Sequence, residues 1–436
     1  MRVTPHALLC LFVIVLPLAG AAESAPSLSL EQALASVDKV NVTVLLSREA
    51  AAQSLELTNQ LRAGTLPIVT GSLVQRRSLG VSTAGVAVSG TPASRFDAQL
   101  AGSYSILDFN RRATLKSSRV GVEVAQANYS AVVQSALTSV AQTYFTHLRN
   151  LRRLAVFDAS IVRARSLLDL AKNQLAAGVA TQIDVTRADS VLALADQARL
   201  QQVTVLYQSE LLLKRLLDID AAATVQLADF SVKRRPTTLL AFGDQKTAFD
   251  TRADYLAATK SLEQITEDVR AAAYERLPSL SLTGQYGLAS ANFDESDKKT
   301  TWASGIGLSL PIFDGLRAGA DKRVALSRQR AQEARLHSLE LQISAELRLA
   351  LQDAGSRNAQ IEVAEKSLRL SQEELRLAQQ RYRQGVADNR EVVEAQNRLA
   401  IADDNLVEAV YQYNLSRVEL ARARGDVRTV LSEKAP

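Results

Sequence analysis

The sequence contains a single cysteine, Cys10, which lies in an apolar segment at the N-terminus. If that segment is removed from the mature protein, the remaining chain cannot form a disulfide, a thiolate nucleophile or a cysteine-based metal site. The sequence also has no HExxH, P-loop or nucleophile-elbow pattern. We therefore expect a protein that is not an enzyme and that binds no cofactor and no metal.

Blocks of like charge and long apolar runs are also missing. The 51 basic and 46 acidic residues are spread along the chain, for a net charge of +5. This mixture does not predict a nucleic-acid partner. Past the N-terminus there is no run of about 18 apolar residues, so no membrane-spanning helix is expected. With 47% hydrophobic and 22% charged residues and few Gly and Pro, the composition is typical of a folded, helix-rich protein.

Residues 1–22 have the plan of a secretory signal peptide. Arg2 precedes the apolar run Ala7–Leu16, and small residues at 19–22 follow Pro17. The run is too short to cross a bilayer as a stable helix. An exported chain without a spanning helix is periplasmic, secreted, or part of a β-barrel in an outer membrane.

Two tandem copies of about 200 residues make up the rest of the chain. The segment SILDFNRRA at 105–113 matches PIFDGLRA at 311–318, and Gly178 has a counterpart 207 residues later in Gly385. Such self-similarity in register indicates an internal repeat. Ser105 in the first copy corresponds to Pro311 in the second, which predicts a less rigid strand exit in the first copy. The predicted organisation is a first repeat at 23–220, an equatorial linker at 221–243, a second repeat at 244–426 and a C-terminal tail at 427–436.

Within each copy the apolar period changes from helix to strands and back to helix. A helix is expected from Leu30 to Arg62, and strands are expected at 66–79 and 94–108 in the first copy and at 277–290 and 301–313 in the second. These strands alternate apolar with small or polar residues, a pattern used by transmembrane barrels. A soluble sandwich hairpin would show the same alternation.

Heptad ladders of apolar residues follow the strands and predict coiled-coil packing. Gly178 and Gly385 each separate two ladders, so each is expected at the turn of a long antiparallel helical hairpin. The helices at 110–175 and 316–384 would each be about 100 Å long. His147 lies on a ladder rung and is expected to be a hydrogen-bonded packing residue. The first ladder is Val133, Val140, His147, Leu154, Ile161, Leu168 and Leu175.

Four strands are too few to close a barrel, and lipid does not tolerate open sheet edges. If the strands enter a membrane, the chain must therefore oligomerise, with two, three or four copies giving about 8, 12 or 16 strands.

With these features the chain resembles the TolC-like outer membrane efflux protein family. The likeness rests on the tandem copies, the PIFD-G exit of the fourth strand and the turn formed around Tyr382, Gly385 and Ala395. The resemblance implies an α+β membrane protein located in the outer membrane and extending into the periplasm. It implies a homotrimer whose 12-stranded outer-membrane β-barrel, with four strands per chain, continues into a long periplasmic α-helical coiled-coil barrel. The implied partners are outer-membrane lipid, a periplasmic adaptor (membrane fusion) protein and an inner-membrane transporter.

The implied function is the passive exit duct of a tripartite efflux or export system. Two alternatives stay open: the exit duct of a type I protein secretion system, and a structural periplasmic coiled-coil protein whose strands form a soluble hairpin domain. The sequence does not identify the cargo.

The resemblance also implies the residues of the periplasmic mouth. It places acidic residues just past the second turn, here Glu391 and Glu394, with Asp184 and Arg187 at the matching positions of the first copy. In a trimer, three copies of each carboxylate near the axis would favour cations and repel one another, which would raise their pKa values. An ordinary solvated helix surface is the alternative for these residues. The expected adaptor-docking tips are Gly178, Val179, Thr181, Gln182, Gly385, Val386, Asp388, Asn389 and Arg390.

Overall fold

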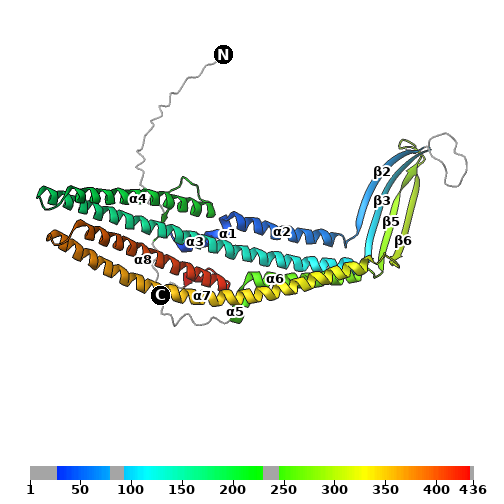
Figure 1. Cartoon of the computed structure of the whole chain (residues 1–436). Coiled ribbons are helices and arrows are strands. Elements are labelled where there is room, and N and C mark those ends of the chain that lie inside the picture. The colour runs from blue at the N-terminus through cyan, green and yellow to red at the C-terminus, as the bar shows by residue number, and fades with distance from the viewer. Residues whose placement is uncertain (1–26, 79–92, 229–244, 433–436) are drawn as a thin grey trace, which may run out of the picture.

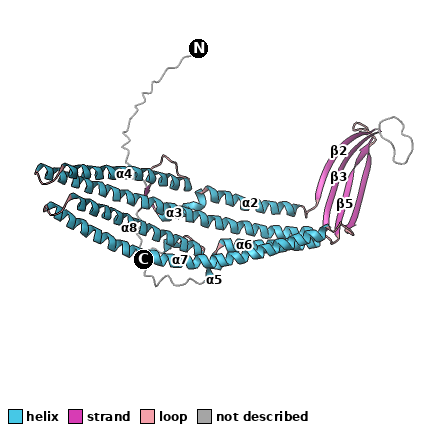
Figure 2. Ribbon diagram, in the orientation of Figure 1, coloured by secondary structure: helices cyan, strands magenta, loops and turns pink. Residues whose placement is uncertain are grey.

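The computed structural model describes residues 27–78, 93–228 and 245–432, and the expected signal peptide lies outside these ranges. The molecule is elongated, with a four-stranded sheet at one end and two helical hairpin tips at the other (Figure 1). Figure 2 shows that helices form nearly all of the remaining length. The first copy contains β1 (Ser27–Leu28), α1 (Leu30–Val40), α2 (Val42–Ala63), β2 (Ile68–Ser78), β3 (Ala93–Leu107), α3 (Phe109–Ala176) and α4 (Gln182–Leu216). The linker contains β4 (Gln226–Leu227). The second copy contains α5 (Gln245–Thr251), α6 (Ala253–Tyr274), β5 (Ser279–Ser290), β6 (Lys299–Ser309), α7 (Arg317–Arg383) and α8 (Asn389–Arg424), and α9 (Thr429–Ser432) follows in the tail.

Asn41 divides the helix that the sequence predicts from Leu30 to Arg62. Its backbone is extended, so it ends α1 and begins α2. Its side-chain oxygen accepts hydrogen bonds from the backbone N–H groups of Thr43 and Val44, at 3.1 and 3.3 Å. Its Nδ2 donates to the carbonyl of Leu216 at 3.0 Å. This cap satisfies the free N–H groups of α2 and also ties the break to the end of α4.

The sheet is antiparallel in the order β2-β3-β5-β6, and its two faces differ in chemistry. The register aligns Leu100, Tyr286 and Trp302 on one face. That face is apolar and open, with Trp302 74% and Ile306 70% exposed. The opposite face carries mainly hydroxyl, amide and small side chains, with charged side chains at the end far from the helices, and a shallow hollow lies along its middle. Because side chains alternate along a strand, one register fixes both faces.

The two copies differ where strand becomes helix. Between β3 and α3 only Asp108 intervenes, and its side chain accepts the N–H of Arg111 at 2.9 Å. Between β6 and α7 lie residues 310–316, which include Gly315 and Leu316, both at positive φ. The second copy therefore has the longer irregular exit, although Ser105 and Pro311 predict the less rigid one in the first copy. The strand expected at 301–313 ends earlier, two residues before Pro311, which has no N–H to donate to a sheet.

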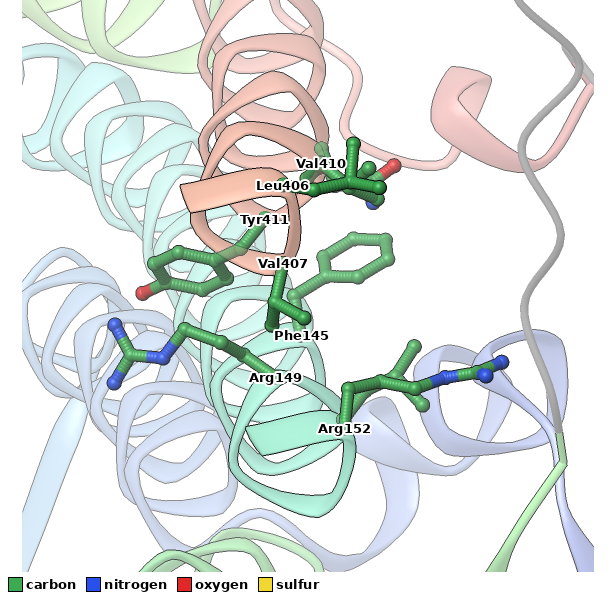
Figure 3. A pocket seen from close by; sticks show the side chains of 9 residues that line it. Phe145, Arg149, Arg152, Leu406, Val407, Val410 and Tyr411 are labelled. Atoms are coloured by element: carbon green, nitrogen blue, oxygen red, sulfur yellow. The ribbon is translucent and has the colours of Figure 1, made fainter. Parts of the chain in front are cut away.

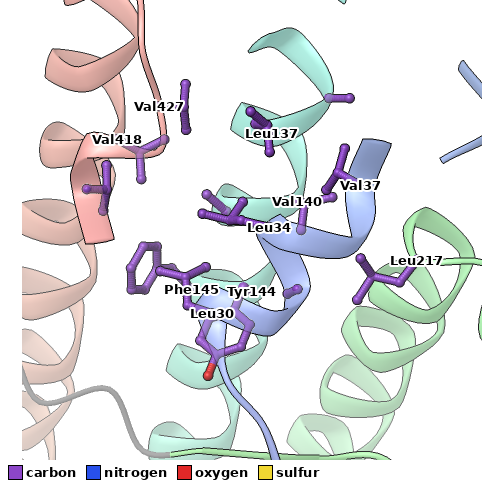
Figure 4. Packing of buried hydrophobic residues seen from close by; sticks show 14 of the residues in the cluster. Leu30, Leu34, Val37, Leu137, Val140, Tyr144, Phe145, Leu217, Val418 and Val427 are labelled. Carbon is purple, nitrogen blue, oxygen red and sulfur yellow. The ribbon is translucent and has the colours of Figure 1, made fainter. Parts of the chain in front are cut away.

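The main core lies halfway along the helices, where α1, α3, α4 and α8 meet (Figure 4). Leu34, Val140 and Val418 are fully buried there. The phenol of Tyr144 donates to the carbonyl of Ala228 at 2.8 Å, next to the paired strands β1 and β4. Apolar burial of this kind is the main source of stability. The rest of the core cluster is Leu30, Ala33, Val37, Val44, Val133, Ala136, Leu137, Ala141, Phe145, Leu213, Leu217, Ala421, Val427 and Val430.

Each repeat ends in a pair of long antiparallel helices. α3 has 68 residues and α7 has 67, so each spans about 100 Å. α3 packs on α4 and α7 on α8, and α3 also contacts α8. Within the described ranges, no helix is long and apolar enough to cross a lipid bilayer. The expected linker at 221–243 is described only as far as residue 228. The segment after residue 426 is partly packed, because Val427 and Val430 enter the core.

Candidate site at the helical hairpin tips

The two tips are built by the same backbone turn. Gly178 and Gly385 have φ of +74° and +70°. The N–H of Val179 donates to the carbonyl of Gln174 at 2.9 Å, and the N–H of Val386 donates to that of Arg381 at 3.0 Å. Apart from the adjoining residues, no group in the described part of the chain lies within 4 Å of the position that a Cβ would take on either glycine. The positive φ of the turn, and not crowding, therefore favours glycine at both tips.

Side-chain caps begin the helix that leaves each tip. In the first copy the carboxylate of Asp184 accepts hydrogen bonds from the N–H and hydroxyl of Thr181, at 2.9 and 2.7 Å. In the second, Asp388 accepts the N–H of Glu391 at 3.2 Å. The bonds from Thr181, together with the charge of nearby Arg187, lower the pKa of Asp184. Asp184 is therefore ionised and held in a cap.

Arginines accompany both acidic residues of the second tip. Arg381, at the end of α7, lies 3.0 Å from a carboxylate oxygen of Glu391. Glu394 lies between Arg390 and Arg398, at 3.7 and 3.8 Å. In the first copy Arg187 and Asp184 are 3.5 Å apart. Within one chain the expected entrance residues thus form opposite-charge pairs, and the negative field at the tip is weaker than the two glutamates alone suggest.

Two amide side chains join the hairpins close to their tips. Nδ2 of Asn389 donates to the carbonyl of Asp184 at 2.8 Å, and Nε2 of Gln174 donates to the carbonyl of Tyr382 at 3.3 Å. Asn389 is fully buried by this contact, so it is not exposed to a partner, whereas Val179 and Val386 are each 68% exposed. The other expected docking residues, Gly178, Thr181, Gln182, Gly385, Asp388 and Arg390, are exposed.

A small apolar core lies directly behind these links. It brings Ala188 of α4 together with Val392 of α8 and Tyr382 of α7. The hydroxyl of Tyr382 is buried and has no hydrogen-bond partner among the described residues. Burial raises the pKa of this phenol, and the charges of Asp184 and Asp388 raise it further. The tip is therefore a packed unit with two buried polar atoms that lack a partner among the described residues, this hydroxyl and Oδ1 of Asn389.

Farther from the tips, α3 and α8 form a seam of ion pairs. Arg153 makes two hydrogen bonds to Asp404, each of 2.5 Å. Arg163 and Asp403 approach only to 3.8 Å. Burial raises the pKa of Asp403, although the charge of Arg163 opposes that change. One pair is thus tightly bonded, whereas the neighbouring Asp403 is half-buried and has only a distant ion-pair partner.

The seam also contains a mostly apolar groove between α3 and α8 (Figure 3). The guanidinium of Arg149 lies 4.4 Å from the centre of the Tyr411 ring, a cation–π contact. The same guanidinium lies 3.5 Å from Glu408, and Thr146 lies within 3.1 Å of the Tyr411 hydroxyl. The groove is lined by Phe145, Leu148, Arg149, Arg152, Leu406, Val407, Val410, Tyr411 and Asn414.

Sequence reasoning found the turns and their acidic residues but missed the arginine partners. Arg390 and Arg398 lie four residues from Glu394 on each side, a spacing that predicts a helical ion pair. Arg153 and Asp404 are 251 residues apart, and no local pattern pairs them. His147 is buried, with Nδ1 2.9 Å from the hydroxyl of Ser209, which confirms its expected packing role. No cluster of three or more His, Cys, Asp or Glu side chains in the described ranges could hold a metal ion.

Comparison with known proteins adds the following findings. A family model described as "Outer membrane efflux protein" matches residues 26–218 and 246–426. The outer membrane protein OprJ of Pseudomonas aeruginosa is 30% identical over 326 residues, which are 72% of this chain and 65% of OprJ. The outer-membrane channel OprN has the same fold, with a TM-score of 0.81 at 22% identity over 91% of this chain and 89% of that one. The CmeC outer membrane channel of Campylobacter jejuni gives a TM-score of 0.83 at 21% identity over 93% and 88%.

Proposed function

The chain belongs to the outer membrane efflux protein family and is located in the outer membrane, and on that premise we propose that it is the exit duct of a tripartite efflux or export system. The matched region spans slightly less than two thirds of OprJ. The duct would be a passive channel through the outer membrane and the periplasm. Its inner-membrane transporter would select the cargo, which this chain does not determine.

The observation that carries the proposal is the sheet. One of its faces is apolar and exposed, the other is polar and hollowed, and its outer strands β2 and β6 have no neighbour among the described strands. In lipid, each unpaired backbone group would cost several kcal/mol. Three chains would pair these edges in a closed barrel of twelve strands, with the apolar face toward lipid and the polar face toward water. We therefore propose a homotrimer.

The helical hairpins would continue the duct across the periplasm. Helices of about 100 Å are too long to surround a hydrophobic core within one chain, and their length suits the wall of a tunnel. We propose that the tips form the periplasmic mouth and that their exposed residues, including Val179 and Val386, dock a periplasmic adaptor. Exposed apolar side chains at a hairpin tip are suited to burial against a partner.

We propose that Glu391 and Glu394, with Asp184 and Arg187 of the first copy, line the narrow entrance. Each carboxylate has an arginine partner within the chain. The charge at the entrance would therefore depend on which of these pairs the trimer keeps. The type I secretion duct remains the alternative, since it would use the same fold with a polypeptide cargo.

The test is single-channel conductance of the purified protein in a planar bilayer, for the wild type and for E391A/E394A. A cation-selective conductance that grows or loses selectivity in the variant would support both the duct and its acidic entrance. If the wild type conducts and the variant has the same conductance and selectivity, the proposed duct would stand, but the proposed role of Glu391 and Glu394 at the entrance would be refuted. A protein that neither forms SDS-resistant trimers nor inserts into the bilayer would refute the proposal in favour of a structural periplasmic coiled coil.

A further inference from the structure

Charge is distributed very unevenly along the polar face of the sheet. The register defines three successive cross-strand rows without a single ionisable side chain. The two rows beyond them, at the end far from the helices, carry four ionisable groups in the described strands: Asp97 and Lys299 in one row, and Arg76 and Arg95 in the next. The uncharged rows are Ile68–Ser103–Thr283–Gly305, Thr70–Ala101–Gln285–Ala303 and Ser72–Gln99–Gly287–Thr301.

Arg76 and Arg95 stand directly opposite each other on neighbouring strands. Like charges in that position destabilise a sheet, so folding stability does not account for the pair. Asp97 compensates only one of the two, because its carboxylate accepts both of its hydrogen bonds from Nε of Arg95, at 2.8 and 2.9 Å. Arg76 has no ion pair among the described residues and is exposed. Three cations and one carboxylate leave a net charge of +2 per chain on these two rows.

The β5–β6 loop packs against the apolar side of the sheet. Phe293 of that loop packs edge-on against Phe96, with ring centres 5.1 Å apart. Because successive side chains alternate, Phe96 is on the apolar face and its neighbours Arg95 and Asp97 are on the polar one. Lys298 also lies on the apolar side, 5.3 Å from the centre of the Phe293 ring. The loop thus leans away from the polar face.

We propose that Arg76, Arg95 and Lys299 form a cationic collar at the outer mouth of the duct, which favours small anions there and repels cations. This inference rests on the proposed function, since only a closed trimer with its polar face inward would bring three copies together. The collar would carry a charge of +6 above a wall that is otherwise neutral. Fixed charge rings at a constriction set the local concentration of permeant ions.

The experiment measures reversal potentials of single channels in a KCl gradient centred near 0.1 M, for the wild type and R76Q/R95Q. Losing two cations per chain takes the collar from +6 to zero, and we expect the chloride-to-potassium permeability ratio to fall about threefold. The difference should disappear near 1 M KCl, where the screening length is only about 3 Å. All variants share one entrance, so any difference between them arises at the sheet.

R77Q is the matched control, because Arg77 neighbours Arg76 but lies on the apolar face. We expect R77Q to keep the wild-type ratio, and R76K/R95K, which retains the charge, to keep it as well. If the chloride-to-potassium permeability ratio of R76Q/R95Q at 0.1 M equals that of the wild type and R77Q, the proposed collar is refuted. The proposed duct would not be affected by that result. A wild type that neither forms SDS-resistant trimers nor inserts into the bilayer would overturn the proposed function, and the collar with it.

Discussion

Two adjacent aspartates on α8 should respond in opposite ways to the same substitution. Asp404 receives two hydrogen bonds of 2.5 Å from Arg153, and the two side chains are 34% and 31% exposed. An asparagine would keep the shape but lose the charge, and its NH2 group cannot accept a hydrogen bond, so only one of the two bonds would remain. Since Arg153 is partly solvated, we expect D404N to lower the free energy of unfolding by about 1–2 kcal/mol.

Asp403 is the opposite case, because its carboxylate is 3.8 Å from Arg163 and burial raises its pKa. A carboxyl whose pKa is higher in the folded state than in the unfolded state binds more protons when folded, so its contribution to stability falls as pH rises through the folded-state pKa. At neutral pH the ionised form therefore disfavours folding. We expect D403N to be as stable as the wild type or more stable, with any advantage vanishing below the ordinary aspartate pKa.

The assay is urea unfolding of the purified protein in detergent, followed by far-UV circular dichroism at one fixed protein concentration. A double-mutant cycle of D404N with R153Q should give a coupling energy of about 1–2 kcal/mol. If D404N unfolds like the wild type, or if D403N is destabilised as much as D404N, the reasoning about this seam is refuted.

Three further outcomes follow from the tips. R381A frees Glu391 from its 3.0 Å ion pair and should raise the potassium-to-chloride permeability ratio about twofold in planar bilayers, whereas a fall would contradict the pairing. G178A and G385A should each lower the free energy of unfolding by about 1–2 kcal/mol through the positive φ alone; a much larger loss in urea titration would indicate an overlooked contact. Y382F removes a buried hydroxyl without a described partner and should stabilise the chain or leave it unchanged in the same titration, while clear destabilisation would reveal a hidden hydrogen bond.

The sequence predicts the long elements well, because their signals repeat over many residues. The heptad ladder that contains Val140 and Ile161 faces the interior of the helical pairs, and both residues are buried. The strand alternation predicts an apolar face for each strand, and the register then brings Leu100 and Trp302 together on one face of the sheet.

What the sequence does not predict is decided by single residues or by contacts between distant segments. Asn41 lies within an otherwise helical pattern, and the bond that ties its cap to α4 goes to the carbonyl of Leu216, which no window of 18 residues contains. Burial of Asn389 likewise depends on a carbonyl of the other hairpin. Acidic residues past a turn can be read from the chain, but their arginine partners across that turn cannot.

The two strand exits have a mechanical consequence. α3 is joined to β3 by Asp108 alone, so a rotation applied at the first tip passes along a nearly continuous rod to the sheet. α7 reaches β6 through seven irregular residues, two of them at positive φ, which can absorb rotation before it reaches the strand. The connection from α3 to the sheet is thus stiff, and the connection from α7 to the sheet is compliant. Torque on α7 and α8 would be damped before it disturbed the sheet, while α3 would keep the two ends of the molecule in fixed alignment.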